Sequence, residues 1–353
     1  MTEQRGAGQA TDDACGTDLL EPAVSRPFTI RCHPGKLSSV KVPSREELET
    51  AHCWLEHDAV PGDEELTDFR RAVRYHNAKW REANGYPIGA HRTRPGAPPR
   101  LIGSQLDRDF ARETGATFLS DKARAAARIR SDLVEPHQRF DRQIFWADLL
   151  SSEALAVNLF GDLQADLDRA DRAVHTWWPD APGRVSEVRF YHSPGRFDPA
   201  YSNSLRSFDA MFVLDLDDGT QGAVAVDTKY REIANREGAK PSHLPRFTEI
   251  HDRSGAFAPG AVDVLSKSLL ALMWLEHVLL LSMLQHASGH WTWGRYVVVH
   301  PEGNLDTVRC ADEYRQLLAD DATFGSMTME DLLAAKVLTQ RTTAALRRRY
   351  IVR

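Results

Sequence analysis

The chain has 353 residues, of which 42% are hydrophobic and 27% are charged, and its formal net charge is −6. This composition allows one large hydrophobic core or two smaller ones, and the acidic balance excludes a strongly basic footprint, so any contact with nucleic acid must come from local patches. The four cysteines have no Cys-x-x-Cys spacing, which argues against a disulfide framework or a cysteine zinc site. The N-terminus lacks the apolar segment of a signal peptide, and we expect a cytoplasmic protein.

The front of the chain divides into a polar arm and a helical region. Residues 1–40 mix small and polar side chains with several prolines and lack hydrophobic periodicity, which predicts a flexible arm. Residues 41–135 are predicted to form a helical N-terminal region. Ser44 and Glu47 have the spacing of a capping box at the start of its first helix, and a second helix is expected over about 62–84.

Three side chains of metal-binding type fall close together in this region. His52, Cys53 and His57 have no fourth candidate ligand nearby, so we expect packing residues rather than a metal site. The Pro- and Gly-rich stretch 87–99 predicts a loop. Further on, an Ala- and Arg-rich stretch predicts a helix over 121–133.

Two basic clusters could contact nucleic-acid phosphates. Residues 91–130 hold nine Lys and Arg side chains against four acids, and four arginines lie within residues 347–353. Each cluster could neutralise backbone phosphates, and each also has the composition of a solvated helix face or a frayed tail. The sequence leaves both interpretations open.

Residues 136–303 are predicted to form an α/β core, and residues 304–353 a helical appendage at its edge. The elements expected in the core are a helical region over 136–178, strands over 185–191, 208–216 and 223–232, a helix over 263–287 and a strand over 291–300. This order predicts a mixed sheet with helices packed on it. In the appendage, short helices are expected over 312–318 and 329–336.

The helix over 263–287 is the most apolar segment, yet we expect it in the core rather than in a membrane. Its apolar run is shorter than about 20 residues, and Glu276 and His277 lie in the middle of it. We expect His277 to be a hydrogen-bonded core residue. The polar stretch 234–260 before this helix could be a lid over a substrate or an ordinary surface excursion.

The stretch 207–232 carries the most information about function. Its residues 217–219, Asp-Asp-Gly, separate two apolar runs and predict a three-residue hairpin loop with Gly at a position of positive φ. Such a loop places Asp209 opposite Asp227 on the adjacent strand, with Lys229 on the same face as Asp227. A two-residue loop would shift the register by one residue and turn Asp209 to the other face.

Two carboxylates at this separation repel each other unless a cation lies between them. Mg2+ takes oxygen ligands of this kind, with water and substrate phosphate completing its shell. Lys229 beside the ion could orient an attacking water, help to deprotonate it, and offset the charge that builds on a phosphate. These residues outline a phosphodiesterase site, and the alternative is a surface hairpin with weak, solvated ion pairs.

A wider pattern surrounds the hairpin. It consists of Phe190-Tyr191-His192-Ser193-Pro194, then Phe208-Asp209, then Asp227-Thr228-Lys229-Tyr230-Arg231-Glu232. This pattern resembles the PD-(D/E)XK nuclease superfamily, in a bacterial branch that reads F-E-x-S-P, F-D and E-x-K-Y-x-E. Asp227 stands where the branch more often has Glu, which the superfamily pattern allows, and Tyr191 stands where an acidic residue is expected. The resemblance covers about residues 139–300.

The resemblance implies an α/β, restriction-endonuclease-like fold with an αβββαβ core, preceded here by the N-terminal helical extension. It also implies a nuclease that depends on Mg2+ or Mn2+, with Asp209, Asp227 and the Thr228 backbone carbonyl as metal ligands. Lys229 would position the attacking water. Glu153 lies on the segment that resembles the first core helix, and it is either a further ligand or an exposed helical Glu.

The resemblance also implies residues that support the ligands, and these are expected to be Tyr191, Ser193, Glu232 and Asn158. Arg196 and Arg206 flank the proposed site and Arg246 lies in the polar stretch 234–260, so these arginines could bind phosphate or pair with nearby acids. The implied partner is nucleic acid, DNA before RNA, with no membrane contact. A restriction or phage-defence setting, with a homodimer or a partner protein, is compatible with the branch.

Two other functions remain open on the sequence. A nuclease fold kept as a nucleic-acid-binding or assembly scaffold would explain Tyr191, although the joint presence of Asp209, Asp227 and Lys229 argues against lost chemistry. A Schiff-base lysine is disfavoured, because two adjacent carboxylates would keep Lys229 protonated. The sequence contains no Walker loop, G-x-G-x-x-G, H-E-x-x-H or G-x-S-x-G motif.

Overall fold

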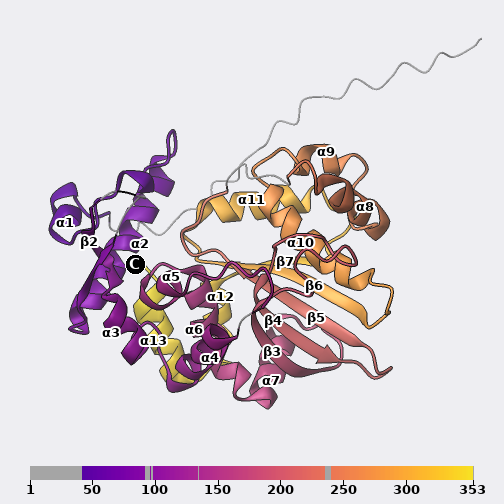
Figure 1. Ribbon diagram of the computed structural model, residues 1–353, viewed down its shortest axis with the longest axis horizontal. Coiled ribbons are helices and arrows are strands. Elements are labelled where there is room, and N and C mark those ends of the chain that lie inside the picture. Colours follow the sequence, from indigo (N-terminus) through magenta and orange to yellow (C-terminus); the bar gives the residue numbers. More distant parts are fainter. Residues whose placement is uncertain (1–41, 92–95, 97, 134, 235–239, 353) are drawn as a thin grey trace, which may run out of the picture. The chain divides into compact units, whose positions relative to one another are not determined.

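The structure, a computed structural model, describes residues 42–352 except for 92–95, 97, 134 and 235–239. The arm expected over residues 1–40 lies outside the described residues. A five-stranded mixed sheet forms the centre of the described part (Figure 1). Its strands, in spatial order, are β3 (Arg184–His192), β4 (Phe208–Asp215), β5 (Gln221–Thr228), β6 (Trp291–His300) and β7 (Phe324–Thr328). Strand β4 is antiparallel to both of its neighbours, β3 and β5, whereas β5, β6 and β7 are parallel.

The hairpin between β4 and β5 has the predicted register. Asp215 pairs with Gln221 and Ala210 pairs with Val226. The turn is closed by the Gly219 amide, which donates to the Leu216 carbonyl at 3.0 Å, and Gly219 has φ 81°. Only a residue without a Cβ takes this left-handed conformation without strain, so the three-residue loop is confirmed.

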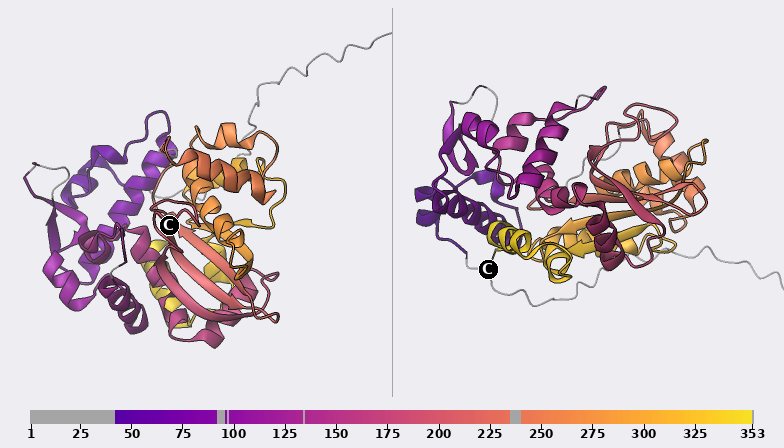
Figure 2. Two further views of the ribbon diagram at one scale, coloured as in Figure 1. Left: turned by 45° about the vertical axis from the view of Figure 1, so that its right-hand side comes forward. Right: turned by 90° about the horizontal axis from the view of Figure 1, so that it is seen from below.

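The sheet is buried on both faces, because alternate side chains of each strand enter two separate hydrophobic layers. Phe212, Val226 and Val297 belong to one layer, and Met211 and Val298 belong to the other. Figures 1 and 2 show helices on both faces of the sheet. The first layer includes residues of α6 (Ser152–Gln164), α7 (Leu167–Trp177), α12 (Met329–Ala334) and α13 (Gln340–Tyr350). The second includes residues of α8 (Leu244–Ser254), α9 (Ala261–Leu265), α10 (Ala271–Leu284) and α11 (Leu305–Arg315).

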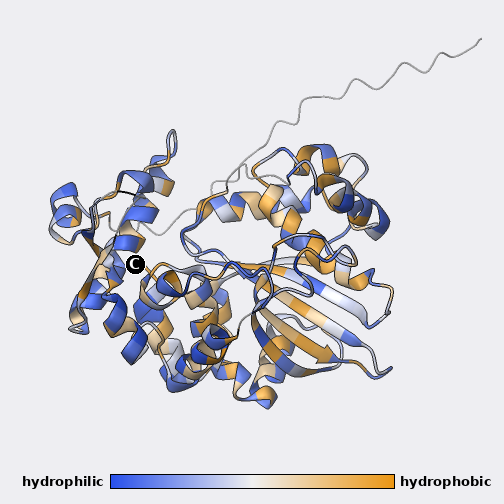
Figure 3. Cartoon of the chain, in the orientation of Figure 1, coloured by the Kyte–Doolittle hydropathy of each residue, from blue (hydrophilic) through white to orange (hydrophobic). Residues whose placement is uncertain are grey.

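Helix α10 is apolar around almost its whole circumference, as its orange colour in Figure 3 shows. Such a helix belongs in a protein core or a membrane. No helix among the described residues is long and apolar enough to cross a membrane. His277 on α10 is fully buried and hydrogen-bonds to the Tyr314 hydroxyl at 3.0 Å and the Thr323 hydroxyl at 2.9 Å, which confirms the expectation of a hydrogen-bonded core histidine.

The described front region contains α1 (Arg45–Thr50), a 3-10 turn η1 (Glu56–Asp58), α2 (Glu64–Ala83), β1 (Ile88–His91), β2 (Arg100–Leu106), α3 (Arg108–Thr114), α4 (Asp121–Asp132) and α5 (Arg142–Ala147). The capping box of Ser44 and Glu47 is present at the start of α1. The antiparallel ribbon of β1 and β2 was not expected in the region predicted to be helical with a loop over 87–99. Strand β2 lies against α2, and this tertiary contact leaves no periodic signal in the short strands.

Several predicted boundaries were wrong for physical reasons. The helical region expected over 136–178 is three helices, because Ser151 and Asp166 accept hydrogen bonds from backbone amides and start new helices as N-caps. The strand expected to reach 232 ends at Thr228. Residues 304–353, expected to be a helical appendage, supply β7 to the central sheet and α13 to its hydrophobic layer.

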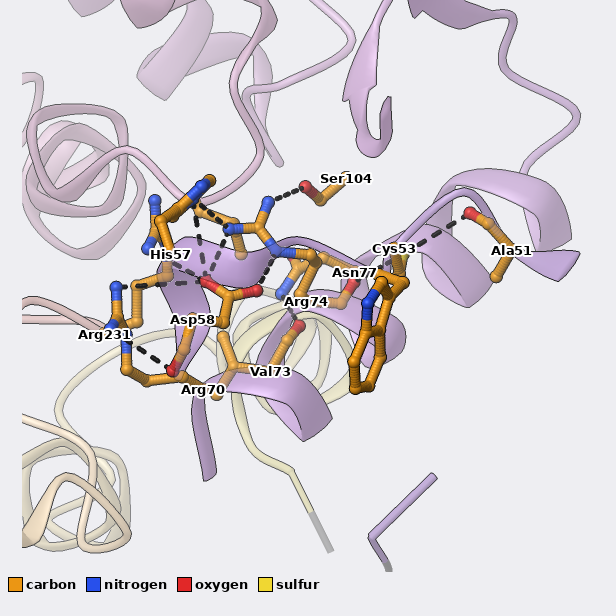
Figure 4. Close-up of polar contacts among 12 residues, drawn as sticks. Ala51, Cys53, His57, Asp58, Arg70, Val73, Arg74, Asn77, Ser104 and Arg231 are labelled. Carbon is orange, nitrogen blue, oxygen red and sulfur yellow. Dashed lines mark hydrogen bonds and ion pairs between the residues drawn. The ribbon is translucent and has the colours of Figure 1, made fainter. Parts of the chain in front are cut away.

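A buried cluster of charged side chains ties the front region to the segment that follows β5 (Figure 4). At its centre lies Asp58, whose side chain is 0% exposed. Arg74 donates to both carboxylate oxygens of Asp58, Arg231 lies 3.6 Å from Oδ1 and Arg70 lies 3.9 Å from it. His57 borders the same carboxylate at 3.8 Å. The segment after β5 is therefore anchored by an ion pair to η1, and the same carboxylate pairs with two arginines of α2.

Tyr230 makes a second connection between the same parts. Its hydroxyl accepts a hydrogen bond from Asn77 Nδ2 of α2 at 2.9 Å and donates to the Tyr350 carbonyl at the end of α13 at 3.3 Å. The side chain is fully buried in the first hydrophobic layer. Arg231 lies beyond the end of β5, and its side chain turns to Asp58.

Candidate active site

Three neighbouring strands place one polar side chain each in a single row. The pairs on either side, Phe190 with Ala210 and His192 with Phe208, put Tyr191 opposite Asp209. The hairpin register puts Asp209 opposite Asp227. The row opens into a cleft of about 620 Å³ that Lys229, Glu153, Arg206 and Glu276 also line.

Asp227 and Lys229 form the tightest pair in the cleft. Lys229 Nζ lies 2.6 Å from Asp227 Oδ2, and the Tyr296 hydroxyl donates to the same oxygen at 3.1 Å. Burial alone would lower the pKa of Lys229, but Asp227 and Asp209 beside it raise that pKa above its ordinary value. Lys229 is therefore a fixed ammonium group, and it serves as a hydrogen-bond donor rather than as a proton acceptor.

Asp209 is held by the chain of the opposite strand. Its Oδ2 accepts hydrogen bonds from the Thr228 amide at 2.8 Å and from the Thr228 hydroxyl at 2.7 Å, and the same hydroxyl lies 2.9 Å from the Ser152 carbonyl. Burial and the charge of Asp227 raise the pKa of Asp209 well above its ordinary value.

Glu276 of α10 is a cleft residue that the sequence analysis did not assign to the site. The residue is 8% exposed, and Oε1 pairs with Arg206 Nη1 at 3.2 Å. Burial, opposed by Arg206 and reinforced by Asp227, raises the pKa of Glu276 to about 7. The sequence did contain a signal for this residue, since a charged side chain in the middle of the most apolar helix is unusual.

Glu153 lies in the first turn of α6 and lines the same cleft as Asp209 and Asp227. Burial, followed by the nearby charge of Asp141, raises the pKa of Glu153 to about 7. Whether it binds metal stays a prediction.

Of the four expected supporting residues, Tyr191 alone is among the described residues that line the cleft. Tyr191 lines the cleft, with its hydroxyl donating to the Arg139 carbonyl, and the buried Ser193 hydroxyl has no hydrogen-bond partner in the described chain. Asn158 lies away from the cleft, where it bonds to the Thr117 carbonyl at 3.1 Å and the Tyr350 hydroxyl at 2.8 Å. It braces α6 against the end of α13. Glu232 accepts from the Arg231 amide at 3.0 Å and does not line the cleft.

Of the three arginines expected to bind phosphate, only Arg206 lines the cleft. Arg196 is buried against Glu135, and Arg246 pairs with Glu249 at 2.7 Å and donates to the Tyr201 carbonyl. In the two basic clusters of the sequence, Arg130 and Arg349 are buried and bonded to the protein, whereas Arg112 and Arg128 are exposed. Arg139 and Lys240 are basic cleft residues that the sequence analysis did not assign to the site.

The donor set fits a hard divalent cation that keeps part of its water shell. Within the described residues there is no group of three or more His, Cys, Asp or Glu side chains that could hold a metal ion, and His52, Cys53 and His57 form no such group either. Asp209 and Asp227 each direct Oδ2 into protein hydrogen bonds and leave Oδ1 without a hydrogen bond from the described chain. Mg2+ is commonly held by one or two carboxylates together with water, and a cation would relieve the repulsion that raises the pKa of Asp209.

Comparison with known families gives one match over most of the chain. A model of the PD-(D/E)XK nuclease superfamily matches residues 61–352. The chain belongs to this superfamily. The match extends beyond residues 139–300, which the motif resemblance covers. It includes α2 and α13, which anchor Tyr230, whereas Asp58, the partner of Arg231, lies before it. No curated protein and no solved structure matched the chain.

PD-(D/E)XK nucleases act on nucleic-acid phosphodiester bonds and generally use Mg2+ or Mn2+. The mixed sheet flanked by helices confirms the predicted restriction-endonuclease-like fold class.

Proposed function

We propose that the protein is a nuclease that depends on Mg2+ or Mn2+ and hydrolyses phosphodiester bonds of nucleic acid. We propose DNA rather than RNA as its substrate. The observation that carries this proposal is the convergence of Asp209, Asp227 and Lys229 on one cleft, with Lys229 Nζ 2.6 Å from Asp227. Arg206, Arg139 and Lys240 on the walls of the same cleft suit an anionic substrate.

A divalent cation held by Asp209 and Asp227 would supply Lewis-acid polarisation of the phosphate and a lowered pKa for water. The chain's own residues provide the rest. Thr228 fixes the orientation of Asp209 through two contacts, and Tyr296 and Lys229 fix that of Asp227. Lys229, kept protonated by these acids, donates to the attacking water and to the phosphoryl oxygens, where negative charge builds. Arg206 holds a neighbouring phosphate at the cleft wall.

The test is cleavage of plasmid, linear duplex DNA, single-stranded DNA and RNA with Mg2+, Mn2+ or EDTA. We expect metal-dependent cutting by the wild type and its loss in Asp209→Ala and Lys229→Ala. Arg246→Ala, which removes an arginine outside the cleft, is the matched control and should cut normally. Cutting that survives both cleft substitutions would place the chemistry elsewhere.

The second candidate function is a noncatalytic nucleic-acid-binding scaffold, and Tyr191 in the acid row is the observation that favours it. A scaffold would bind nucleic acid equally well in the wild type and in Asp209→Ala, and would show no Mn2+ binding that depends on Asp209. A bacterial restriction or phage-defence setting, with a second copy or a partner protein, rests on the motif resemblance. A screen of phage plating on cells with and without the protein tests that setting.

A further inference from the structure

We propose that Glu276 is a third acidic residue of the metal site, which accepts a hydrogen bond from a water molecule in the hydration shell of the cation held by Asp209 and Asp227. This inference rests on the proposed function and adds a residue that neither the motif pattern nor the family match assigns. Glu276 comes from α10, far in sequence from the hairpin, and reaches the cleft from the helix that covers this face of the sheet.

The first support is the environment of the side chain. Glu276 is 8% exposed on a helix whose other residues are almost all apolar. Burial of a carboxylate is costly unless its oxygens are hydrogen-bonded or paired with charge. Helix α10 covers the face of the sheet to which Asp227 points, and both Asp227 and Glu276 line the cleft. A purely structural acid at position 276 would therefore add repulsion to a site that already holds two carboxylates.

The second support is an unused oxygen. Oε1 of Glu276 pairs with Arg206 at 3.2 Å, whereas the buried Oε2 has no hydrogen-bond partner in the described chain. A buried acceptor left without a donor costs roughly 1–3 kcal/mol. Because Glu276 lines the cleft, we infer that a molecule bound in the cleft provides the missing donor.

A water molecule bound to the cation accounts for the missing donor at Oε2 better than direct coordination of the cation by Glu276 does. The described residues contain no group of three metal-binding side chains close enough to hold an ion together, so Glu276 does not complete a cage with Asp209 and Asp227. Mg2+ retains several waters, and these waters are strong donors. Residues that bond to the inner ligands of a metal typically affect affinity by about 10–100-fold.

The alternative is that Glu276 only holds Arg206 for phosphate binding. That role uses Oε1 and leaves Oε2 without a function. The two roles differ in measurable ways, because loss of Arg206 removes a positive charge near the site. If Glu276 serves the cation, Arg206→Gln should leave cation affinity unchanged or increase it. If Glu276 serves Arg206 alone, Glu276→Gln should weaken nucleic-acid binding only.

The experiment measures Mn2+ binding, without nucleic acid, by electron paramagnetic resonance of free Mn2+ and by titration calorimetry. The proteins are the wild type, Glu276→Gln, Arg206→Gln, Asp209→Asn and the control Glu249→Gln. Glu249 also pairs with an arginine, Arg246 at 2.7 Å, but lies outside the cleft. Circular dichroism checks that each variant is folded.

We expect Glu276→Gln to weaken Mn2+ binding about 10–100-fold, Asp209→Asn to weaken it further, and Glu249→Gln to leave it unchanged. Wild-type Mn2+ affinity in folded Glu276→Gln would overturn this inference while leaving the proposed function intact. Equal weakening in Arg206→Gln would also overturn it, because Glu276 would then act through Arg206. A wild type that binds no Mn2+ would overturn the proposed function and this inference together.

Discussion

Two buried clusters in this protein combine acids with Arg or Lys side chains, and they are electrostatic opposites. Around Asp58, one carboxylate meets Arg70, Arg74 and Arg231, so cations are in excess. Burial would raise the pKa of Asp58, but the hydrogen bonds and charge of Arg74, followed by the charge of Arg231, hold that pKa below its ordinary value. The acid is ionised, and Arg74 satisfies both of its oxygens.

In the cluster around Lys229, by contrast, acidic side chains outnumber basic ones. Asp209, Asp227 and Glu276 meet Lys229 and Arg206, and the pKa values of Asp209 and Glu276 are raised by burial and by the neighbouring carboxylate. Glu276 keeps an unpartnered oxygen. The comparison shows how the same residue types serve two purposes. A buried acid with all its partners present holds parts of the fold together, whereas acids without enough partners form a binding site for a cation.

The largest effect is expected from the removal of Asp58. Asp58→Ala leaves three buried or half-buried guanidinium groups without their shared acid, and we expect it to lower the free energy of unfolding by about 3–5 kcal/mol. Denaturant unfolding in EDTA measures this change. The matched change in the cleft, Asp209→Asn, removes an acid from a cluster with too many and should leave metal-free stability unchanged or raise it. Equal destabilisation by both variants would contradict the comparison.

The second prediction concerns stabilisation by metal. A cation that binds only the folded state at a concentration 100 times its dissociation constant should stabilise the protein by about 2.7 kcal/mol. We expect Mg2+ or Mn2+ to raise the melting temperature of the wild type and not that of Asp227→Asn. Arg231→Ala, which weakens the other cluster, should lower the melting temperature but keep its response to metal.

The third prediction is an opposite pH dependence of the two clusters. The raised pKa of Glu276, about 7 against an ordinary 4.5, makes its contribution to stability complete below pH 4.5 and lost as the pH rises through 7. Metal-free wild type should therefore lose stability over this range, with a slope from this group of at most about 1.4 kcal/mol per pH unit. Glu276→Gln should flatten the profile.

Asp58 has the reverse sign. Its folded pKa lies below the ordinary 3.8, so its contribution is present above pH 3.8 and lost as the pH falls through the folded value. Urea unfolding at a series of pH values separates the two effects. An unchanged slope in Glu276→Gln between pH 4.5 and 7 would show that this acid does not titrate as the cleft geometry indicates.

The smallest expected effect is that of Tyr230→Phe, which removes the hydrogen bonds to Asn77 and to the Tyr350 carbonyl without changing the packing of the ring. We expect a loss of about 1 kcal/mol in the free energy of unfolding. Cleavage by the folded variant should be close to that of the wild type, because the Asp58–Arg231 pair still anchors the segment after β5. A large loss of cleavage without a loss of stability would instead make Tyr230 a positioning residue for Lys229.

The sequence by itself determined the hairpin and what it carries. A three-residue Asp-Asp-Gly loop fixes the register, and the register alone places Asp209 opposite Asp227. The fold class followed from the order of the core helices and strands over residues 136–300, because local hydrophobic patterns predict these elements. Local rules also gave the capping box of Ser44 and Glu47. These features depend on residues only a few positions apart.

Tertiary structure decided everything that depends on distant segments. Glu276 reaches the cleft because α10 packs on one face of the sheet, and no local pattern connects it with a hairpin about 50 residues earlier. Strand β7 and the ribbon of β1 and β2 form because a partner strand is present, so their short segments lack a signal of their own. Arg196 was ambiguous for the same reason, because an arginine pairs with whichever acid the fold brings near it, here Glu135.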